Sequence, residues 1–334
     1  MARVAILGAT GAVGRPMLQV LAARALPIDE LVLLASARSA GSEVAFKGET
    51  LTVREVSAEA FDGVDVAIFS AGATRSREWA PIAVERGAVV VDNSSAFRMQ
   101  DDVPLVVADV NPEAIRAHRG LIANPNCSTM QLMPVVRPVR DAAGLERLTV
   151  ATYQAVSGTG QAAIDALLEE SREALAGADD PAPRQYPKPI AFDVLPVAGS
   201  FSGDDGYTDE ELKLVNESRK ILDLPDLRVS ATCTRVPVVN GHAEAVWIET
   251  AEPLSADAFR ALLEAEPGVA VIDDPAAMAY PTARQASGRE GVLVGRIRRD
   301  LGVPNGLACW VVADNLRKGA ASNAVDIAEI LLAG

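Results

Sequence analysis

The sequence predicts an α/β protein built from two domains, and three observations carry this prediction. A short apolar strand, a glycine turn and a helical pattern follow one another over residues 3–21. Strands that end in small-residue loops then recur through the first third of the chain, as is typical of a parallel sheet covered by helices. Longer β-rich runs at 148–156, 228–238 and 307–313 indicate a second, α+β domain. A chain of 334 residues is long enough for two cores.

Composition limits the classes of function. The net charge of −14 at pH 7 argues against a nucleic-acid-binding protein. No apolar run reaches the roughly 18 residues of a membrane span, and the N-terminus enters a strand without a signal segment. The three cysteines lie far apart and lack CxxC spacing, which disfavours a disulfide scaffold and a metal site. We therefore expect a cytoplasmic protein that holds no metal and contacts neither nucleic acid nor membrane.

The N-terminal motif is the segment 8–14, Gly-Ala-Thr-Gly-Ala-Val-Gly, between the strand at 3–7 and a helix that begins near Pro16. Glycines at this place let backbone N–H groups approach a pyrophosphate at the N-terminus of the helix. The alternative is an ordinary tight turn. Because strand, turn and helix occur together, the motif favours a Rossmann-like dinucleotide-binding domain.

The loop after the second strand bears on the choice of dinucleotide. That strand spans 30–35, and the loop 35–41 offers Arg38 between two serines and no acidic residue. An NAD site usually has a carboxylate here for the ribose 2′-hydroxyl, whereas a cation suits a 2′-phosphate. Arg38 could also be a solvated surface residue. The loop favours NADP.

Three further strands are expected at 64–69, 88–91 and 103–108. The loops that follow them, including the one from Asn93 to Arg98, would meet at the carboxyl edge of the sheet. Ligands bind at this edge in doubly wound folds.

Cys127 is the most informative residue of the chain. It lies in Ala-Asn-Pro-Asn-Cys-Ser-Thr-Met, residues 123–130, directly before an apolar helical pattern. At a helix N-terminus, backbone N–H groups and the helix dipole favour a thiolate and can also stabilise an oxyanion. The alternative is a small buried hydrophobic residue. The sequence around it predicts a nucleophile placed near the dinucleotide.

The second half supplies further polar groups. Gln154 lies inside an apolar strand, where a buried amide needs a partner, and a glycine turn follows at 157–160. Thr208 and Glu211 have the spacing of a capping box, which places Glu210 and Lys213 one turn apart on a helix, by default as a surface ion pair.

A strand at 228–238 contains Arg235, and the turn Asn240-Gly241 leads to His242. The other histidine, His118, lies in a polar helix end, so His242 is the expected partner of a catalytic cysteine. A purely structural histidine is the alternative. A closing helix is predicted from Ser322 to Leu332.

Taken together, these segments resemble the aspartate-semialdehyde dehydrogenase family over nearly the whole chain. The resemblance rests above all on Asn-Cys-Ser-Thr at 126–129, on Arg-Val-Pro at 235–237 and on Gly-His at 241–242. It implies a glyceraldehyde-phosphate-dehydrogenase-like architecture. An NADP-binding domain, 1–126 completed by 315–334, would accompany a catalytic and dimerisation domain at 127–314.

The resemblance also implies roles for individual residues. Cys127 would form an acyl thioester, His242 would be the acid/base group and Gln154 would orient the substrate. Residues expected to hold NADP are Gly8, Thr10, Gly11, Ala12, Val13, Ser36, Arg38, Ser39, Ser157, Gly158 and Asn315. Residues expected to bind substrate or phosphate are Arg98, Asn126, Glu210, Lys213 and Arg235.

The implied reaction reduces L-aspartyl 4-phosphate to L-aspartate 4-semialdehyde with release of phosphate, reversibly, in the biosynthesis of lysine and diaminopimelate, threonine and methionine. A homodimer or a tetramer is the implied assembly. Two alternatives stay open. N-acetyl-gamma-glutamyl-phosphate reductase shares the thiol chemistry but has no free substrate amine for Glu210. A non-catalytic dinucleotide-binding paralogue should have lost Cys127 or His242.

Overall fold

The computed structural model describes residues 2–178 and 181–333, and contacts divide the chain into two compact units. Unit 1 is Met1–Asn126 with Gly319–Gly334, and unit 2 is Cys127–Lys318. The chain thus enters unit 2 immediately before Cys127.

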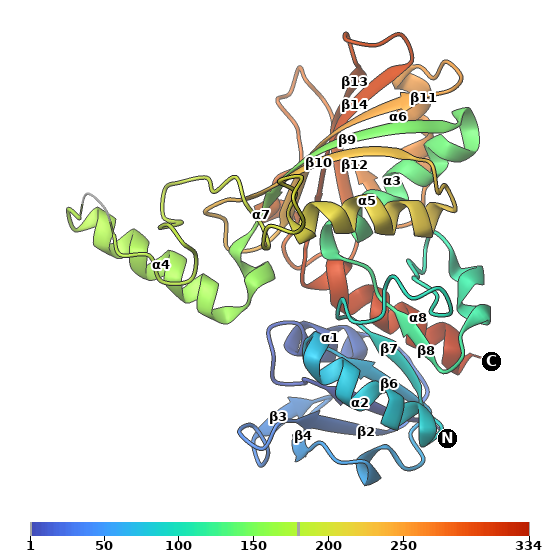
Figure 1. The fold of residues 1–334 in the computed structure, drawn as a ribbon, viewed down its shortest axis with the longest axis vertical. Coiled ribbons are helices and arrows are strands. Elements are labelled where there is room, and N and C mark those ends of the chain that lie inside the picture. The colour runs from blue at the N-terminus through green and yellow to red at the C-terminus, as the bar shows by residue number, and fades with distance from the viewer. Residues whose placement is uncertain (1, 179–180, 334) are drawn as a thin grey trace. The chain divides into compact units, whose positions relative to one another are not determined.

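Unit 1 contains a six-stranded parallel sheet in the order β5-β2-β1-β6-β7-β8 (Figure 1). Its strands are β1 (Ala2–Leu7), β2 (Ile28–Ala35), β5 (Arg54–Glu55), β6 (Val66–Phe69), β7 (Val89–Asp92) and β8 (Leu121–Ala123). The accompanying elements are the hairpin β3 (Glu43–Phe46) and β4 (Glu49–Thr52), the helices α1 (Gly14–Ala23), α2 (Ala73–Glu85) and α8 (Ser322–Leu332), and short 3-10 turns at Glu59–Phe61 and Pro112–Ala117. All four residues of β6 are buried, as expected for a strand covered on both faces.

The closing helix α8 completes the core of unit 1. It packs on α1, β6 and β7, and its apolar residues join those of the sheet. Asn323 fixes it in place, because its side chain accepts from the Ala108 N–H at 2.7 Å and donates to Val106 O at 2.8 Å. The predicted bounds, Ser322 to Leu332, are confirmed.

The prediction of a strand at 103–108 is wrong. Only Leu105 forms an isolated bridge there, to Ala123 of β8, a strand that the sequence had not predicted. Pro104 lacks the N–H that a ladder needs. The Asn111 side chain replaces ladder partners, accepting from Val107 N–H and donating to Leu105 O.

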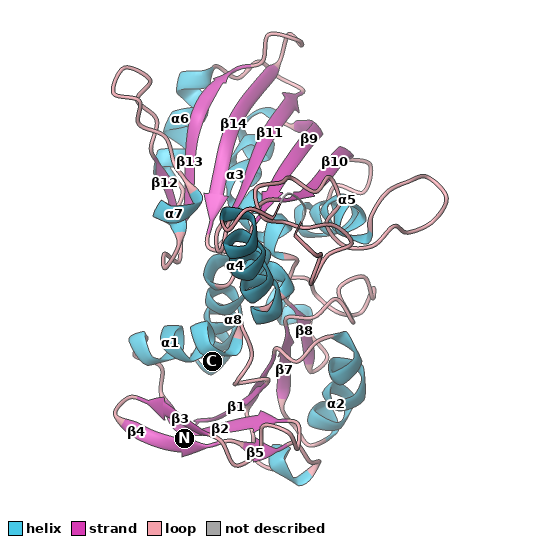
Figure 2. Cartoon of the chain, turned by 90° about the vertical axis from the view of Figure 1, so that its left-hand side faces the viewer, coloured by secondary structure: helices cyan, strands magenta, loops and turns pink. Residues whose placement is uncertain are grey.

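Unit 2 is built on a mixed six-stranded sheet in the order β10-β9-β11-β14-β13-β12 (Figure 2). Its strands are β9 (Leu145–Gln154), β10 (Arg228–Arg235), β11 (His242–Thr250), β12 (Val269–Val271), β13 (Val292–Arg299) and β14 (Gly306–Ala313). Its helical elements are α3 (Cys127–Ala143), a 3-10 turn (Val156–Thr159), α4 (Gln161–Leu175), α5 (Asp209–Leu222), α6 (Ala256–Ala265), α7 (Ala283–Ala286) and a π-helical turn (Arg317–Ala321) that runs into unit 1. Helices α3, α5 and α6 pack against the strands.

Burial alternates along β9. Thr152 and Gln154 are buried on the helix side, whereas Tyr153 is 38% exposed and stacks on Trp310 of β14. The segment after α4 is irregular, as predicted for 179–189: residues 181–189 form no helix or strand, and 179 and 180 lie outside the described residues. No helix among the described residues is both long and apolar enough to cross a membrane.

Candidate active site

The glycine turn between β1 and α1 is packed so tightly against neighbouring backbone that side chains at Gly8 or Gly14 would clash with it. Gly8 has φ +94°, and a Cβ there would lie 2.4 Å from Ser70 O. A Cβ at Gly14 would lie 2.3 Å from Gly8 O. The turn closes through Gly11 N–H to Gly8 O at 3.0 Å. Since the first N–H groups of a helix have no partner within it, those of α1 fit a pyrophosphate here.

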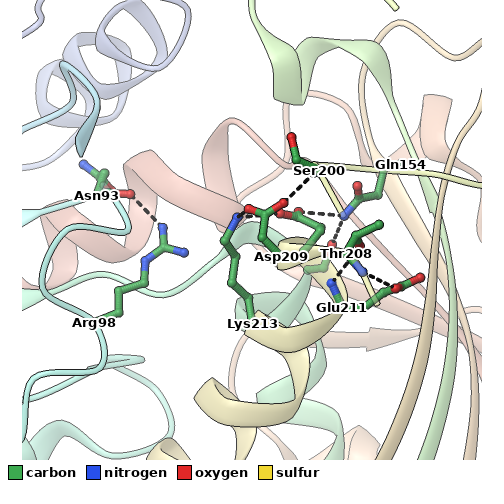
Figure 3. A network of polar contacts seen from close by, with 10 residues as sticks. Asn93, Arg98, Gln154, Ser200, Thr208, Asp209, Glu211 and Lys213 are labelled. Carbon is green, nitrogen blue, oxygen red and sulfur yellow. Dashed lines mark hydrogen bonds and ion pairs between the residues drawn. The ribbon is translucent and has the colours of Figure 1, made fainter. Parts of the chain in front are cut away.

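The turn that follows β2 lies at the same sheet edge. Ser36 O accepts from Ser39 N–H at 2.9 Å, and this tight turn holds Arg38 with its side chain exposed. An exposed guanidinium beside serine hydroxyls fits a 2′-phosphate. Arg98, also in unit 1, is buried and donates to Asn93 O at 2.8 Å (Figure 3).

Cys127 is the first residue of α3 and is partly exposed. The other two cysteines, Cys233 and Cys309, are buried. Burial raises the pKa of both thiols, that of Cys309 to about 12, so both remain protonated and inert. The chain therefore presents one accessible thiol, and it lies where helix N–H groups can stabilise a thiolate.

Gln154, at the end of β9, ties three elements together. Its Nε2 donates to Ser128 Oγ at 2.6 Å and to Glu210 Oε1 at 3.0 Å. Ser128 follows Cys127 directly, so the Gln154 amide links the first turn of α3 to the first turn of α5. Sequence reasoning missed the role of Ser128, although it stands in the Asn-Cys-Ser-Thr motif.

The first turn of α5 carries a carboxylate and an ammonium group. The predicted capping box is present, with Thr208 and Glu211 bonded reciprocally. Lys213 Nζ lies 3.1 Å from Glu210 Oε2 and 2.6 Å from Asp209 Oδ2 (Figure 3). Burial opposes the charge of Lys213, but the two carboxylates outweigh it and raise its pKa. The pair forms as predicted, but Glu210 is largely buried rather than on an open surface.

Arg235 and His242 are joined through the backbone of one residue, Ala155. Arg235 Nη1 donates to Ala155 O at 2.9 Å, and Ala155 N–H donates to His242 Nδ1 at 3.0 Å. Because Nδ1 accepts, the ring proton resides on Nε2. Burial and then the charge of Arg235 lower the pKa of His242 to about 3, against the opposing effect of Glu210. His242 is thus a neutral imidazole with a proton on Nε2.

Gly158 leaves room in front of these two side chains. A Cβ on it would lie 3.1 Å from His242 Nε2 and 3.2 Å from Arg235 Nη1. At these distances a side chain on residue 158 would crowd both Arg235 and His242.

A polar network holds the turn before His242. Asn315 Oδ1 accepts from Gly241 N–H at 2.9 Å, and Asn315 Nδ2 donates to Ser157 Oγ at 2.9 Å. Asp314 accepts from the Asn240 amide and from the Leu316 N–H, both at 2.9 Å. Ser157 and Asn315 were predicted as site residues, whereas no site role was predicted for Asp314 or for Asn240 of the turn. An Asp-Asn pair directly after an apolar strand was the available signal.

Within unit 2, hydrogen bonds and an ion pair therefore connect most of the predicted site residues into two groups. Gln154, Glu210 and Lys213 form one contact chain, while Arg235 and His242 form another. The turn residues Thr10, Ala12 and Val13 are half-buried in unit 1, and Asn126 is buried at its last position. The part of the chain that the structure describes contains no group of three or more ligating side chains that could hold a metal.

Comparisons with known proteins identify the family to which the two units belong. Residues 3–118 match the family model of the semialdehyde dehydrogenase NAD binding domain, and residues 136–318 match that of the semialdehyde dehydrogenase dimerisation domain. Unit 1 is accordingly a nicotinamide-dinucleotide-binding domain, and unit 2 supports oligomerisation. Nothing in these matches favours a non-catalytic protein.

Named relatives cover the chain almost completely. It is 50% identical over 333 residues to aspartate-semialdehyde dehydrogenase of Aquifex aeolicus, with 99% of this chain and 98% of the relative aligned. The enzyme of Legionella pneumophila is 51% identical, with 98% and 95% aligned. The crystal structure of aspartate semialdehyde dehydrogenase II from Vibrio cholerae superposes with a TM-score of 0.96 at 48% identity, covering 99% of this chain and 98% of that one. The chain belongs to the aspartate-semialdehyde dehydrogenase family.

Proposed function

We propose that this chain catalyses the NADP-dependent reductive dephosphorylation of L-aspartyl 4-phosphate to L-aspartate 4-semialdehyde, reversibly, in the pathway to lysine, diaminopimelate, threonine and methionine. One observation carries the proposal. An accessible thiol opens α3, and the residue after it bonds to Gln154, which in turn bonds to the Glu210–Lys213 pair. A solved Vibrio cholerae relative, 48% identical to this chain, is described as complexed with ASA, which supports the substrate.

The dinucleotide-binding residues fit NADP. Gly8, Gly11 and Gly14 form the cradle for its pyrophosphate, and Thr10, Ala12 and Val13 complete the turn. Ser36, Arg38 and Ser39 would hold the 2′-phosphate, while Ser157, Gly158 and Asn315 would line the nicotinamide end. When bound, NADPH supplies the hydride that reduces the acyl group on Cys127. A solved relative from Candida albicans, 26% identical, is described with NADP and supports this choice.

Cys127 carries the acyl group in this mechanism. Its thiolate attacks the acyl carbon of aspartyl phosphate, the C–O bond to phosphate breaks, and a thioester results. Hydride addition converts the thioester to a thiohemiacetal anion. When that anion collapses, the C–S bond breaks, the aldehyde leaves and the thiolate is restored. The proton that the overall reduction consumes leaves with the phosphate.

Four side chains bind the ends of the substrate. Arg235 pairs with its α-carboxylate, and Glu210 faces its amino group. Lys213 and Arg98 bind the phosphate, and Asn126 lies beside the acyl group. Each cation thereby meets an anion, which a protein of net charge −14 has to arrange locally. Gln154 orients the acyl group, since its amide already bonds beside Cys127.

We assign the acid/base role to His242, acting from Nε2. The ring is neutral, so its Nε2–H donates to the oxygen that becomes negative when sulfur or hydride adds to the acyl carbon. The Nε2–H stabilises this oxyanion by a hydrogen bond and keeps its proton, because full transfer would leave an imidazolate ring. A neutral histidine of this kind acts as an electrophile.

The assembly and location are part of the same proposal. We expect unit 2 to form a homodimer through the open face of its sheet, where Tyr153 and Trp310 stack and a cavity of about 520 Å³ is lined mainly by apolar groups. The reaction is placed in the cytoplasm, because Cys127 has to stay a reduced thiol.

The test is oxidation of aspartate semialdehyde in the presence of phosphate, followed as NADPH formation. We expect turnover that requires phosphate and prefers NADP over NAD. Correctly folded protein with no phosphate-dependent turnover would contradict the proposal, and N-acetyl-glutamate semialdehyde serves as the control substrate that should not react.

A further inference from the structure

A second polar layer lies next to the catalytic residues inside unit 2. On strands, residues two apart share a face. Gln154, Arg235 and His242 form the first layer, at the ends of β9, β10 and β11. Two residues further into the same strands lie Thr152, Cys233 and Glu244, with Thr152 paired to both Cys233 and Glu244 in the sheet register.

Helix α3 also contributes one residue to each of the two layers. Gln131 follows Cys127 by four residues, about one turn or 6 Å along the helix. Glu244 follows His242 by two residues, about 6.6 Å along the strand. Helix α3 packs on β11, and the Gln131 side chain lies close enough to Glu244 to lower the pKa of its carboxyl. The two layers therefore have nearly the same rise.

The inner layer has features that a plain core lacks. Gln131 and Glu244 are both 0% exposed, and within residues 2–178 and 181–333 neither side chain has a hydrogen bond of ordinary length. Burial raises the pKa of Glu244 well above its ordinary value, and the Gln131 amide beside it opposes the shift. The titratable groups that sense the Glu244 charge, Cys233 and Cys309, are neutral thiols. Burial therefore favours the neutral carboxyl of Glu244, which can donate to an amide.

We propose that Glu244 and Gln131 are positioning residues, a buried carboxyl–amide pair that fixes α3 against β11 and thereby fixes Cys127 relative to His242. Buried polar groups are costly unless paired, and a buried polar pair can therefore specify one register of the elements that carry it. The inference rests on the proposed function for its kinetic part. It does not depend on the titration of Glu244.

The test compares Glu244→Gln with Glu244→Leu and with the double variant Gln131→Leu/Glu244→Leu. Replacing both members of a buried polar pair by apolar residues is often neutral or stabilising, so the double variant should keep its Tm. We expect its kcat to fall on the order of tenfold, with KM nearly unchanged, because small misplacements of reacting groups are costly. Glu244→Gln should keep kcat within about twofold, since a neutral amide can replace a neutral acid. Met133→Leu, elsewhere on α3, is the control for repacking.

A second measurement does not depend on turnover. Iodoacetamide should alkylate Cys127 selectively, because the other two thiols are buried. We expect the midpoint of the alkylation–pH profile to move to higher pH in the double variant and to stay unchanged in Glu244→Gln and Met133→Leu. If the wild type lacked turnover, the proposed function would be wrong. The alkylation–pH profile of Cys127 would still test the Glu244–Gln131 pair. A folded double variant with wild-type kcat and midpoint would overturn the inference, as would loss of kcat in Glu244→Gln.

Discussion

Cys127 differs from the other two thiols in exposure and in its place at the start of a helix. We predict that Cys127→Ser reduces turnover to background while NADP still binds, because a serine hydroxyl is far less acidic than a thiol and because the cradle lies elsewhere, in unit 1. Calorimetric titration with NADP and the phosphate-dependent assay measure the two properties. Cys309→Ala, at a buried thiol, is the control and should keep its turnover. Residual activity in the serine variant well above background would remove Cys127 from the nucleophile role.

The guanidinium of Arg235 carries five N–H donors in one plane, and Nη1 uses one of them to hold Ala155 O. Lysine at this position keeps the charge but loses the fork that matches a carboxylate. We predict that Arg235→Lys raises KM for aspartate semialdehyde about tenfold or more, as expected for loss of a hydrogen bond between charged groups. Steady-state kinetics check this, with Arg228→Lys, an exposed residue of the same strand, as control. Equal KM values in the two variants would argue against a carboxylate at Arg235.

Arg38 is exposed in a turn without any acidic residue. We predict that Arg38→Asp shifts the ratio of kcat/KM for NADP over NAD toward NAD, since a carboxylate repels a 2′-phosphate and accepts from a 2′-hydroxyl. The two cofactors are compared at saturating semialdehyde and phosphate. An unchanged ratio would place the 2′-phosphate elsewhere.

At the scale of elements, the capping box of α5 connects helix stability to the active site. Thr208→Ala removes the cap and should lower the free energy of unfolding by about 1 kcal/mol. It should also raise KM for phosphate, because the first turn that it fixes carries Glu210 and Lys213. Thr282→Ala removes the matching box of α7, whose first turn carries no predicted site residue, and should lower stability without changing KM. Thermal unfolding and kinetics on both variants separate the two effects, and a similar change of KM in both would contradict the link.

The elements also show why sequence reasoning succeeded in places and failed in others. The capping box and the bounds of α8 are local patterns, and both were predicted. Residues 103–108 have the apolar content of a strand, but Pro104 and the Asn111 side chain satisfy that backbone differently. The role of Cys127 could be predicted because the residues that point to it are its neighbours in the sequence. The Glu244–Gln131 layer could not be predicted from the sequence, because these two residues come together only through strand register and helix packing.

At the scale of the whole molecule, two buried groups couple stability to pH with opposite signs. The pKa of His242 falls from 6.5 to about 3 on folding, so its contribution is present above pH 6.5 and is lost as pH falls toward 3. The pKa of Glu244 is raised above 4.5 on folding, so its contribution is present below pH 4.5 and is lost as pH rises. Above pH 7 His242 is neutral in both states, and the pH dependence of Glu244 can be observed separately.

We therefore predict that Glu244→Gln makes the protein more stable than the wild type above pH 7, by a margin that grows with pH. An unfolded glutamate is ionised there, whereas burial raises the pKa of the folded carboxyl, so the wild type loses stability as pH rises, by at most about 1.4 kcal/mol per pH unit. The glutamine variant has no proton to lose and escapes this cost. Denaturant unfolding of both proteins at pH 7.0, 7.5, 8.0 and 8.5, at one fixed protein concentration, gives the difference, with the exposed Glu264→Gln as control. A constant difference across this range would mean that Glu244 is ionised in the folded protein, and the neutral acid assigned to the inner layer would then be wrong.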